Sequence, residues 1–505
     1  MVNLKLSISP EEMRERFSAL KTAQDVADLL DTDKATLNYH LYICPDKKRY
    51  ATFSIPKRSG GKRKIKAPIS PIKILQRKLN QVLQVVYKQR KPVHGFIRKR
   101  NIISNAKRHV NKRWVLNIDF KDFFPTVSFQ RIRGMFLKNP YSLDKAAATV
   151  LAQLCCCDGT LPQGAPTSPI ITNMICSKLD NQLNRMARRN GCIYTRYVDD
   201  LTFSTNESSF PEKVAKLNSN GKTIVGDDID EIIRKNWFTI NDKKIKLRRY
   251  YMRQEVTGLT VNKKVNVRRK YVKQIRAMLH CWERYGLADA QKEYIKRHQA
   301  KKYRHPSKNV PEYKHILQGK LSFLRDVIGD TNPVYLRYYK QFQRLYLLEF
   351  YNVQRNSTSN TRRGLILEKL INRLFEINGV EVVKSFRRNT GGEQIDGACR
   401  VDSLYYLIEC KWQAKLSGTR DTDAFVTKAS RSGGNTRGIF ISINGWSKNV
   451  PKLLKQNPDK NVILMDGSDI EHVLKHRVNL IELMRAKNKH FSLKAEPYYG
   501  AEKLL

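Results

Sequence analysis

The sequence predicts a chain of at least two domains, in which a larger α+β part precedes a smaller α/β domain. Its 505 residues exceed the size at which one hydrophobic core usually keeps growing. Hydrophobic residues make up 41% of the chain and charged residues 28%, a balance typical of folded globular proteins rather than of disordered chains. Residues 353–363 are polar and lack apolar periodicity, so the domain boundary is predicted there, with 353–361 as the linker.

Helices and strands alternate along the larger part. Apolar side chains recur at three- and four-residue steps, which predicts helices with one buried face; these segments are residues 71–90, 171–179 and 272–282. A short, apolar, β-prone run predicts a buried strand at 114–120, and residues 193–204 predict two strands joined by a tight acidic turn.

The smaller part follows the same pattern. A helix is predicted through residues 367–374, and Gly379 ends it. Short strands are predicted at residues 405–411, 438–442 and 461–465. We therefore expect a domain over residues 362–490, followed by a tail at 491–505.

The charge of the chain is strongly positive. Lys and Arg number 95 against 46 Asp and Glu, a formal net charge of +49, and the chain also contains 23 Tyr. A membrane surface, or a solvated surface without a partner, are the alternatives to nucleic acid, but so large an excess of one sign repels itself in the compact state. The composition therefore favours a nucleic-acid partner.

Neither a membrane span nor a disulfide framework is expected. No stretch reaches the roughly 18 apolar residues of a span, and the first residues lack the apolar core of a signal peptide, so we expect a cytoplasmic protein without a membrane partner. The nine cysteines include no C-x-x-C pair, and three of them are adjacent at 155–157. This pattern favours reduced packing residues over disulfides or tetrahedral zinc.

Three aspartates are candidates for a metal site. Asp119 ends one predicted strand, while Asp199 and Asp200 lie at the turn of the predicted hairpin. Adjacent carboxylates near a third repel by several kcal/mol at about 4 Å unless cations neutralise them. Nucleotide transfer onto a primer 3′-hydroxyl uses two divalent ions about 3.5–4 Å apart, and Mg²⁺ prefers such oxygen ligands. The alternative for an isolated Y-x-D-D pattern is an ordinary hairpin turn.

The surrounding motifs resemble those of the reverse transcriptase family. They occur in the family's order as NIDFKDFF at 117–124, LPQGAPTSP at 161–169, YVDD at 197–200 and FTINDKK at 238–244. The resemblance covers about residues 20–345. It implies an α+β right-hand polymerase of fingers, palm and thumb, followed by an α/β restriction-endonuclease-like domain.

Within residues 1–352, the resemblance implies fingers and palm at about 20–255 and a thumb at about 256–350. It also implies that Asp119, Asp199 and Asp200 hold two Mg²⁺ ions as the catalytic residues.

Further residues match nucleotide contacts of the family, whose substrates are dNTPs. Phe124 matches the aromatic gate that excludes a ribose 2′-hydroxyl, with core packing as the alternative. Gln163 and Gly164 match the loop beside the incoming nucleotide, or else form a proline-flanked turn. Arg63 and Lys244 match residues that contact the triphosphate, and a solvated surface is the alternative for each.

Three short motifs are similar to those of bacterial retron reverse transcriptases: NAKRH at 105–109, VTG at 256–258 and HGF at 94–96. This resemblance implies a cognate structured noncoding RNA, priming from an internal guanosine 2′-hydroxyl, and a cDNA product covalently linked to RNA. No pattern suggests a ribonuclease H domain, so a host ribonuclease H is expected to remove the template. An oligomer is compatible with the sequence.

Four residues of these motifs are candidate RNA contacts: Asn105, His109, Thr257 and Gly258. Asn105 and His109 lie one helical turn apart and could face RNA together, although a structural histidine with satisfied hydrogen bonds is equally compatible with the pattern. The helix at 272–282 and the basic stretch up to Lys308 would then grip an A-form duplex as the thumb.

A second acidic constellation lies in the smaller domain. Asp396 is followed by Glu409 and Lys411, which strand alternation places on one face. This pattern resembles the PD-(D/E)XK superfamily, particularly its Mrr-like branch, in which an earlier helix supplies another acid, here Glu368. Ile395 stands where the superfamily's name places proline.

The resemblance implies a nuclease that uses Mg²⁺ or Mn²⁺, with Lys411 orienting or activating the attacking water. A surface ion pair is the alternative. Because a tethered nuclease near bound nucleic acid needs restraint, we expect the toxic output of an antiphage system, held in check by the polymerase and its product. The alternatives for the whole chain are a group II intron-like or other defence-associated reverse transcriptase, or a non-catalytic RNA-binding scaffold.

Overall fold

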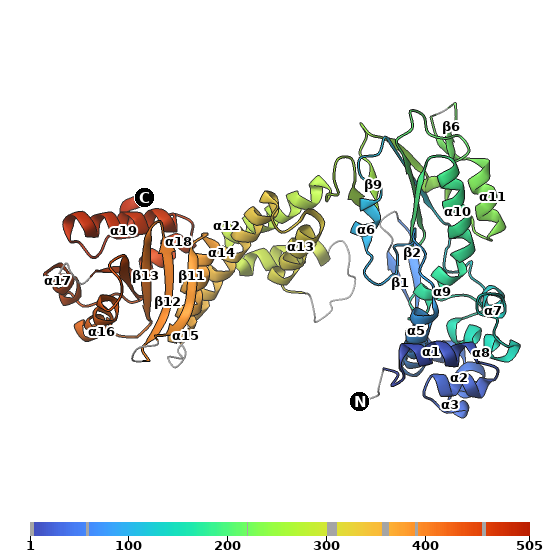
Figure 1. Cartoon of the computed structure of the whole chain (residues 1–505), viewed down its shortest axis with the longest axis horizontal. Coiled ribbons are helices and arrows are strands. Elements are labelled where there is room, and N and C mark those ends of the chain that lie inside the picture. Colours follow the sequence, from blue (N-terminus) through green and yellow to red (C-terminus); the bar gives the residue numbers. More distant parts are fainter. Residues whose placement is uncertain are drawn as a thin grey trace. The chain divides into compact units, whose positions relative to one another are not determined.

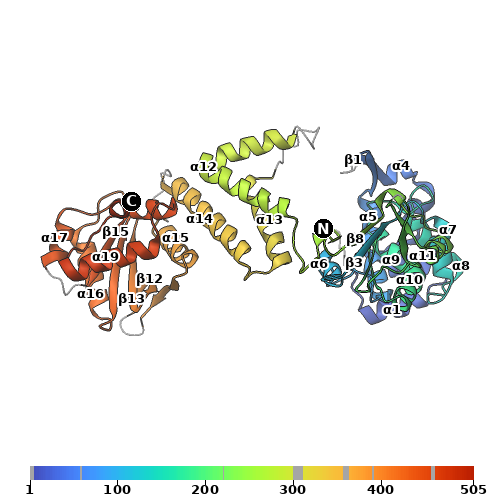
Figure 2. The same ribbon diagram turned by 90° about the horizontal axis from the view of Figure 1, so that it is seen from above.

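The computed structural model describes residues 5–56, 60–219, 221–299, 311–355, 363–388, 392–456 and 461–505. The chain divides into two compact units, Met1–Tyr271 and Val272–Leu505. Figures 1 and 2 show both units from two directions.

The first unit is built around a four-stranded antiparallel sheet of order β4-β5-β3-β8. Its strands are β3 (Trp114–Asp119), β4 (Ile193–Tyr197), β5 (Asp200–Thr205) and β8 (Lys246–Arg249). The other strands form two-stranded ladders: β1 (Tyr50–Pro56) with β2 (Lys62–Pro68), β6 (Ala215–Leu217) with β7 (Thr223–Val225), and β9 (Glu255–Val256) with β10 (Leu259–Thr260). β3 is a central strand and is almost completely buried, as its apolar sequence predicted.

Helices surround this sheet and share one hydrophobic core with it. They are α1 (Pro10–Ser18), α2 (Ala23–Leu29), α3 (Lys34–Asn38), α4 (Asp46–Arg49), α5 (Ser70–Val86), α6 (Ile102–Lys107), α7 (Phe129–Leu137), α8 (Lys145–Cys155), α9 (Ser168–Ile175), α10 (Ser177–Arg189) and α11 (Asp227–Lys235). A π-helical turn, η1 (Tyr39–Ile43), and a 3₁₀ turn, η2 (Asp242–Lys244), complete the list. The single helix expected through residues 171–179 is two helices, α9 and α10, that meet at Cys176.

Three long helices open the second unit: α12 (Arg269–Gln299), α13 (Tyr313–Ile328) and α14 (Pro333–Arg355). Gly286 has a φ of 80° and breaks α12 into two helical segments. The Tyr313 hydroxyl of α13 donates to the Met278 carbonyl of α12 at 2.9 Å, and the Trp282 ring of α12 lies edge-on to Phe342 of α14. These contacts make one packed helical layer.

The rest of the second unit is a five-stranded sheet of order β11-β12-β13-β14-β15 with helices on both faces. Its strands are β11 (Glu381–Arg387), β12 (Gln394–Val401), β13 (Leu404–Lys411), β14 (Thr436–Ser442) and β15 (Val462–Asp466). The helices are α15 (Arg363–Ile377), α16 (Thr419–Ser430), α17 (Asn449–Gln456), α18 (Gly467–Leu474) and α19 (Leu480–Lys494), and a 3₁₀ turn, η4 (Ala501–Leu504), follows. α14, α15, α18 and α19 cover one face, and α16 and α17 cover the other (Figure 1).

The chain divides after Tyr271 and not at the expected boundary of 353–361, so most of the expected thumb (about 256–350) belongs to the second compact unit. Residues 353–355 of the expected linker continue α14, and residues 356–361 lie outside the described residues. α14 also packs Leu347 and Tyr351 into the core beneath the five-stranded sheet. The expected tail begins inside α19, and the Leu464 amide of β15 donates to the Pro497 carbonyl at 2.8 Å. Sequence polarity predicted a boundary near the C-terminal end of α14, but it could not show that α14 packs against the five-stranded sheet.

Two further observations bear on the composition. Among the described helices, none has the length and apolar character needed to cross a membrane. The cysteines form no disulfide, and all of them except Cys281 are buried.

A buried ion pair supports the C-terminal segment, and it yields a stability prediction. The Lys487 ammonium donates to Asp469 at 2.6 Å, to the Leu464 carbonyl at 3.0 Å and to the Tyr499 carbonyl at 2.6 Å, and neither charged side chain is exposed. Lys487→Met leaves the Asp469 carboxylate without its counter-charge, so the free energy of unfolding should fall by about 3–5 kcal/mol. Chemical denaturation measures this loss. Lys489→Met, an exposed position on the same helix, is the control, and an equal stability of both variants contradicts the assigned role.

Candidate active sites

The sheet of the first unit brings the three predicted aspartates together. Residues of β3 pair with β5 in antiparallel register, and the last pair is Asp119 with Asp200. Asp199 directly precedes β5. One carboxylate oxygen from each of the three lies within 4.8 Å of the others. Three converging hard oxygen donors fit divalent ions such as Mg²⁺.

A buried arginine fixes the turn that carries two of these aspartates. The Arg196 guanidinium forms two 2.8 Å contacts with the Asp180 carboxylate of α10 and donates to the Val198 carbonyl at 3.0 Å. Val198 has a φ of +61°. A Cβ at Gly95 would lie 2.6 Å from the Val198 nitrogen, so only glycine fits there. Sequence analysis missed Arg196 and Asp180, although a charged residue inside a predicted buried strand is a signal for an internal ion pair.

Burial and mutual repulsion destabilise the ionised aspartates. Desolvation raises the pKa of Asp199, with a further contribution from the Asp119 charge. Desolvation, followed by the charges of Asp199 and Asp119, raises the pKa of Asp200 to about 7. The Lys244 ammonium lies 2.6 Å from the Asp119 carboxylate, and this hydrogen bond raises the pKa of Lys244. The cluster therefore favours cations, as a metal-binding site requires.

The predicted nucleotide contacts surround the β1–β2 hairpin. The positive charge of Arg63 on β2 lowers the pKa of Asp199 against the larger effect of desolvation, so this guanidinium acts on the cluster. The Gln163 carbonyl accepts from the Lys66 amide at 3.0 Å. Gly164 has a φ of +128°, and a Cβ there would lie 3.0 Å from the Lys66 carbonyl oxygen. The loop at 161–169 therefore packs closely on the strand that carries Arg63.

Phe124 lies at the margin of an aromatic cluster. Its ring stands edge-on to Phe123 with the centroids 5.5 Å apart, and the rings of Phe120, Phe123 and Phe238 all stack on one another with centroids 4.9–5.6 Å apart. Phe123 is buried, whereas Phe124 is only half-buried. Part of the Phe124 ring is therefore available to a ligand.

Asn105 and His109 occupy the interior of the first unit. Both are completely buried. The two ring nitrogens of His109 lie 2.7 Å from the hydroxyls of Ser204 and Thr195, and desolvation lowers the pKa of His109 to about 3. These side chains cannot contact RNA in this conformation. His109 is therefore a structural histidine with satisfied hydrogen bonds, as the alternative from sequence had it. Neither Asn105 nor His109 is proposed as an RNA contact.

Thr257 and Gly258, by contrast, line a cleft of about 540 Å³ together with Asp119 and Asp200. The Thr257 hydroxyl donates to the Ile102 carbonyl at 3.2 Å, so the motif at 256–258 contacts the helix α6 that also carries Asn105. Basic side chains that sequence analysis did not single out line the same cleft: Lys246, Arg248, Arg253 and Arg268. In the sequence, Lys246 and Arg248 belong to a dense run of lysine and arginine at 243–249, which could have indicated them.

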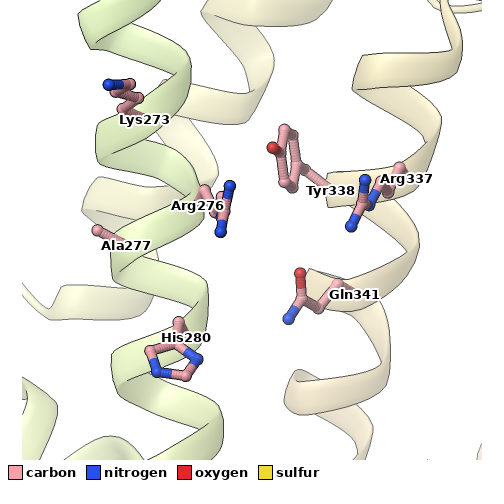
Figure 3. A pocket seen from close by; sticks show the side chains of 7 residues that line it. All are labelled: Lys273, Arg276, Ala277, His280, Arg337, Tyr338 and Gln341. Carbon is pink, nitrogen blue, oxygen red and sulfur yellow. The ribbon is translucent and has the colours of Figure 1, made fainter.

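A second basic cleft, of about 450 Å³, lies between α12 and α14. Figure 3 shows Lys273, Arg276 and His280 on α12 opposite Arg337, Tyr338 and Gln341 on α14. The helix predicted at 272–282 therefore presents basic groups to a cleft, as expected of a thumb. The predicted basic stretch continues beyond residue 299, where residues 300–308 lie outside the described residues.

The sheet of the second unit brings the nuclease candidates together. Pairing between β12 and β13 ends at Gly397 with Ile408, and just beyond it the Asp396 carboxylate accepts from the Cys410 amide at 2.9 Å. The Glu409 carboxylate lies 3.0 Å from the Lys411 ammonium, so both side chains share the face that alternation predicted. Desolvation raises the pKa of Asp396, and the charge of Glu409 adds to this effect.

Two flanking helices complete this group. Glu368 of α15 is half-buried, and desolvation followed by the charges of Asp396 and Glu409 raises its pKa. The Lys428 ammonium of α16 lies 3.2 Å from the Glu409 carboxylate. Sequence analysis missed Lys428, because only the packing of α16 against the sheet brings it to the site. Carboxylates with adjacent ammonium groups are the residue types that bind a metal ion and a scissile phosphate, but among the described residues the oxygens of Asp396, Glu409 and Glu368 do not all lie within 4.8 Å of one another, as those of the first unit do.

Comparison with known proteins identifies both parts of the chain. Residues 55–274 match the family described as reverse transcriptase (RNA-dependent DNA polymerase), and residues 363–474 match the family described as restriction endonuclease. The chain is 34% identical over 318 residues to the retron Mx65 reverse transcriptase of Myxococcus xanthus, covering 59% of this chain and 70% of that protein. The chain belongs to the retron reverse transcriptase family.

Other retron reverse transcriptases are similar over shorter regions. The Mx162 enzyme of Myxococcus xanthus is 36% identical over 259 residues, covering 46% of this chain and 52% of that protein. The Ec86 enzyme of Escherichia coli is 37% identical over 187 residues, covering 37% of this chain and 54% of that protein. The chain thus spans about half the length of these two relatives.

These matches confirm several predictions from sequence. They confirm the recognition of a retron reverse transcriptase with a C-terminal restriction endonuclease domain, and the fold class of a reverse transcriptase-type polymerase followed by a mixed-sheet, endonuclease-like domain. They also confirm the prediction that the chain is an enzyme of the reverse transcriptase class. Both families are metal-dependent.

Proposed function

We propose that this retron reverse transcriptase copies a cognate structured noncoding RNA into a single-stranded DNA that remains linked to RNA, and that its C-terminal domain is a metal-dependent nuclease of antiphage defence. The observation that carries the polymerase proposal is the convergence of Asp119, Asp199 and Asp200, two of which, Asp119 and Asp200, line a cleft together with Thr257 and Gly258. A degenerate RNA-binding scaffold would not need to keep three mutually repelling carboxylates.

The polymerase chemistry follows from this arrangement. Asp119, Asp199 and Asp200 would hold two Mg²⁺ ions, which activate the primer 3′-hydroxyl and stabilise the leaving pyrophosphate. Lys244, 2.6 Å from Asp119, and Arg63 would bind the triphosphate of a dNTP. Gln163 and Gly164 would position the nucleotide from the adjacent loop.

The duplex of template and product needs a second binding surface outside the palm. The cleft between α12 and α14 offers Lys273, Arg276 and Arg337, whose charges suit the phosphates and 2′-hydroxyl face of an A-form helix. A host ribonuclease H would remove the template.

The half-buried Phe124 gives a test of sugar selection. If its exposed face contacts C2′ of the incoming nucleotide, Phe124→Ala should raise ribonucleotide incorporation by about tenfold or more, which corresponds to about 1.4 kcal/mol of lost discrimination. Single-nucleotide extension with dNTPs and rNTPs measures the ratio. Phe123→Leu, inside the buried cluster, is the control for changed packing. Equal sugar discrimination by the parent and Phe124→Ala means that Phe124 serves only the core.

The RNA partner can be identified directly. Nucleic acid that copurifies with the full chain is expected to consist mainly of one structured RNA and a DNA covalently joined to it. Sequencing with and without debranching of the 2′-linkage measures this. A group II intron-like enzyme would instead yield a large intron RNA without attached DNA, and a heterogeneous pool of cellular RNA would contradict the retron proposal.

The nuclease proposal rests on the second acidic site. Asp396, Glu409 and Glu368 would hold Mg²⁺ or Mn²⁺, and Lys411 would orient the attacking water.

The helix α14 supports a link between the two activities. Arg337 of α14 lines the basic cleft, while Tyr351 of the same helix stacks on Trp412, the residue after Lys411. A nucleic acid bound at the cleft therefore lies on a helix that also supports the nuclease sheet.

A further inference from the structure

The first unit contains a larger cleft that the polymerase chemistry does not use. Its volume is about 870 Å³, within the range of clefts that hold small ligands. It lies between the C-terminal end of α5, the loop after α7, and helices α9 and α10, which Figure 1 labels. None of its lining residues lines the cleft that contains Asp119.

The lining of this cleft is positively charged at the rim and apolar at the floor. Four cationic side chains line it: Lys88, Arg90, Lys138 and Lys178. Among the described lining residues none is acidic, and none of these four cations forms an ion pair with a described residue. The floor includes methionine and isoleucine side chains of α9 and the ring of Tyr141. Uncompensated cations over an apolar floor suit an anion that also carries a flat, apolar surface.

Tyr87 adds an independent observation. This residue is 5% exposed, it lines the cleft, and its buried hydroxyl has no hydrogen-bond partner among the described residues. Burial raises the pKa of Tyr87, so the hydroxyl stays a neutral donor. Because this hydroxyl is itself shielded from the cleft, a ligand would contact only the small exposed part of the Tyr87 side chain.

The cleft continues along the exposed side of α10. A second depression of about 510 Å³ shares Asn181 with the cleft and is otherwise lined by Asn184, Arg185, Arg188 and Arg189. Three- and four-residue steps place Lys178, Asn181, Arg185 and Arg188 on one side of the helix. From Lys178 to Arg189 the helix rises roughly 16 Å. A ligand that follows this side must therefore carry several negative charges in a row.

We propose that this surface, the α10 site, binds single-stranded nucleic acid, with a base in the cleft against Tyr87 and Tyr141 and the following phosphates along α10. A single strand fits because its bases are free to enter an aromatic-lined cleft while its backbone tracks basic groups. A duplex offers phosphates but keeps its bases paired. The α10 site goes beyond the polymerase function, and its occupant is a single-stranded segment of RNA or of DNA product.

The test uses the full chain and a short, unpaired oligouridine that carries 4-thiouridine, with an oligothymidine of the same length as the DNA arm. Lys178→Gln combined with Arg185→Gln removes two exposed charges from the α10 site. We expect binding at least about tenfold weaker and a log–log salt slope shallower by about 1.4, since each phosphate contact of a single strand contributes roughly 0.7. Lys73→Gln with Arg77→Gln, two exposed positions on α5, removes equal charge and should change neither quantity.

Two further measurements keep the proposal falsifiable if folding changes. Photo-crosslinks should map to the peptides around Tyr87 and Tyr141, and Lys138→Gln, which removes an exposed cation of the cleft, should weaken binding about threefold or more. Primer extension on a short pre-annealed template should stay unchanged in all these variants, which separates the α10 site from the polymerase proposal. Equal effects of the α10 and α5 pairs, crosslinks confined to the Asp119 cleft, or binding of an acidic peptide in preference to both oligonucleotides would overturn the α10 site.

Discussion

Replacing Asp199 and Asp200 together by asparagine is expected to lower DNA synthesis on an RNA template by a factor of about 10³ or more. Asparagine keeps the shape of the side chain but removes two of the three negative charges that lie within 4.8 Å of one another. Divalent ions then lose most of their binding energy at the site, because neutral amides replace charged oxygen ligands. Primer extension with a defined RNA template at saturating Mg²⁺ measures the loss.

The same variant separates catalysis from RNA binding. Affinity for the RNA, measured by fluorescence anisotropy, should stay within about threefold of the parent, since the basic groups of the cleft are unchanged. Asp227→Asn with Asp228→Asn is the matched control, because these adjacent aspartates are exposed on α11 of the same unit. Continued synthesis by the Asp199 and Asp200 variant would place the polymerase chemistry elsewhere.

The proposed polymerase site could be predicted from the sequence because the positions of its aspartates follow from the periodicity of the strands. Asp119 at the end of a buried strand and Asp199–Asp200 at the turn of a hairpin must meet if those strands pair, and the register of β3 with β5 pairs Asp119 with Asp200. The same period-two rule placed Glu409 and Lys411 on one face of β13. In both cases the alternation of side chains along a strand predicted which of them lie close together.

Features that depend on packing between segments far apart in the sequence could not be predicted. Helical spacing correctly placed Asn105 and His109 on one side of a turn, but it could not show that this side faces Ser204 and Thr195 in the interior. Lys428 reaches Glu409 only because α16 packs against β14. Such contacts depend on how elements stack, and the periodicity of a single segment shows which face is buried but not against what.

α14 illustrates the same limit at the level of domains. Its polar C-terminal end predicted a linker, yet Tyr351 near that end is completely buried and stacks on Trp412 with the ring centroids 5.7 Å apart. A polar end of a helix is compatible with solvent on one side and a packed face on the other. The composition of the segment predicted a boundary there, but it could not show that one helix lines the basic cleft and also packs on the nuclease-like sheet.

The nuclease half of the proposal predicts that Lys411→Ala and Asp396→Ala each lower nucleic-acid cleavage by about 10²–10⁴-fold and remove any toxicity of the chain in cells. Lys411→Ala takes away the ammonium 3.0 Å from Glu409, and with it the group that would orient the attacking water. Asp396→Ala takes away a metal ligand. Cleavage of labelled DNA and RNA with Mg²⁺ or Mn²⁺ measures the activity and identifies the substrate.

DNA synthesis should remain within about twofold of the parent in both variants, because the three aspartates proposed for the polymerase belong to the other compact unit and sites without shared contacts act independently. Lys415→Ala, an exposed lysine shortly after β13, controls for loss of a positive charge near the site. Its cleavage and toxicity should match the parent. If Lys411→Ala and Asp396→Ala chains still cut nucleic acid and still protect cells, the acidic site of the second unit is not the site of cleavage, and this half of the proposal fails.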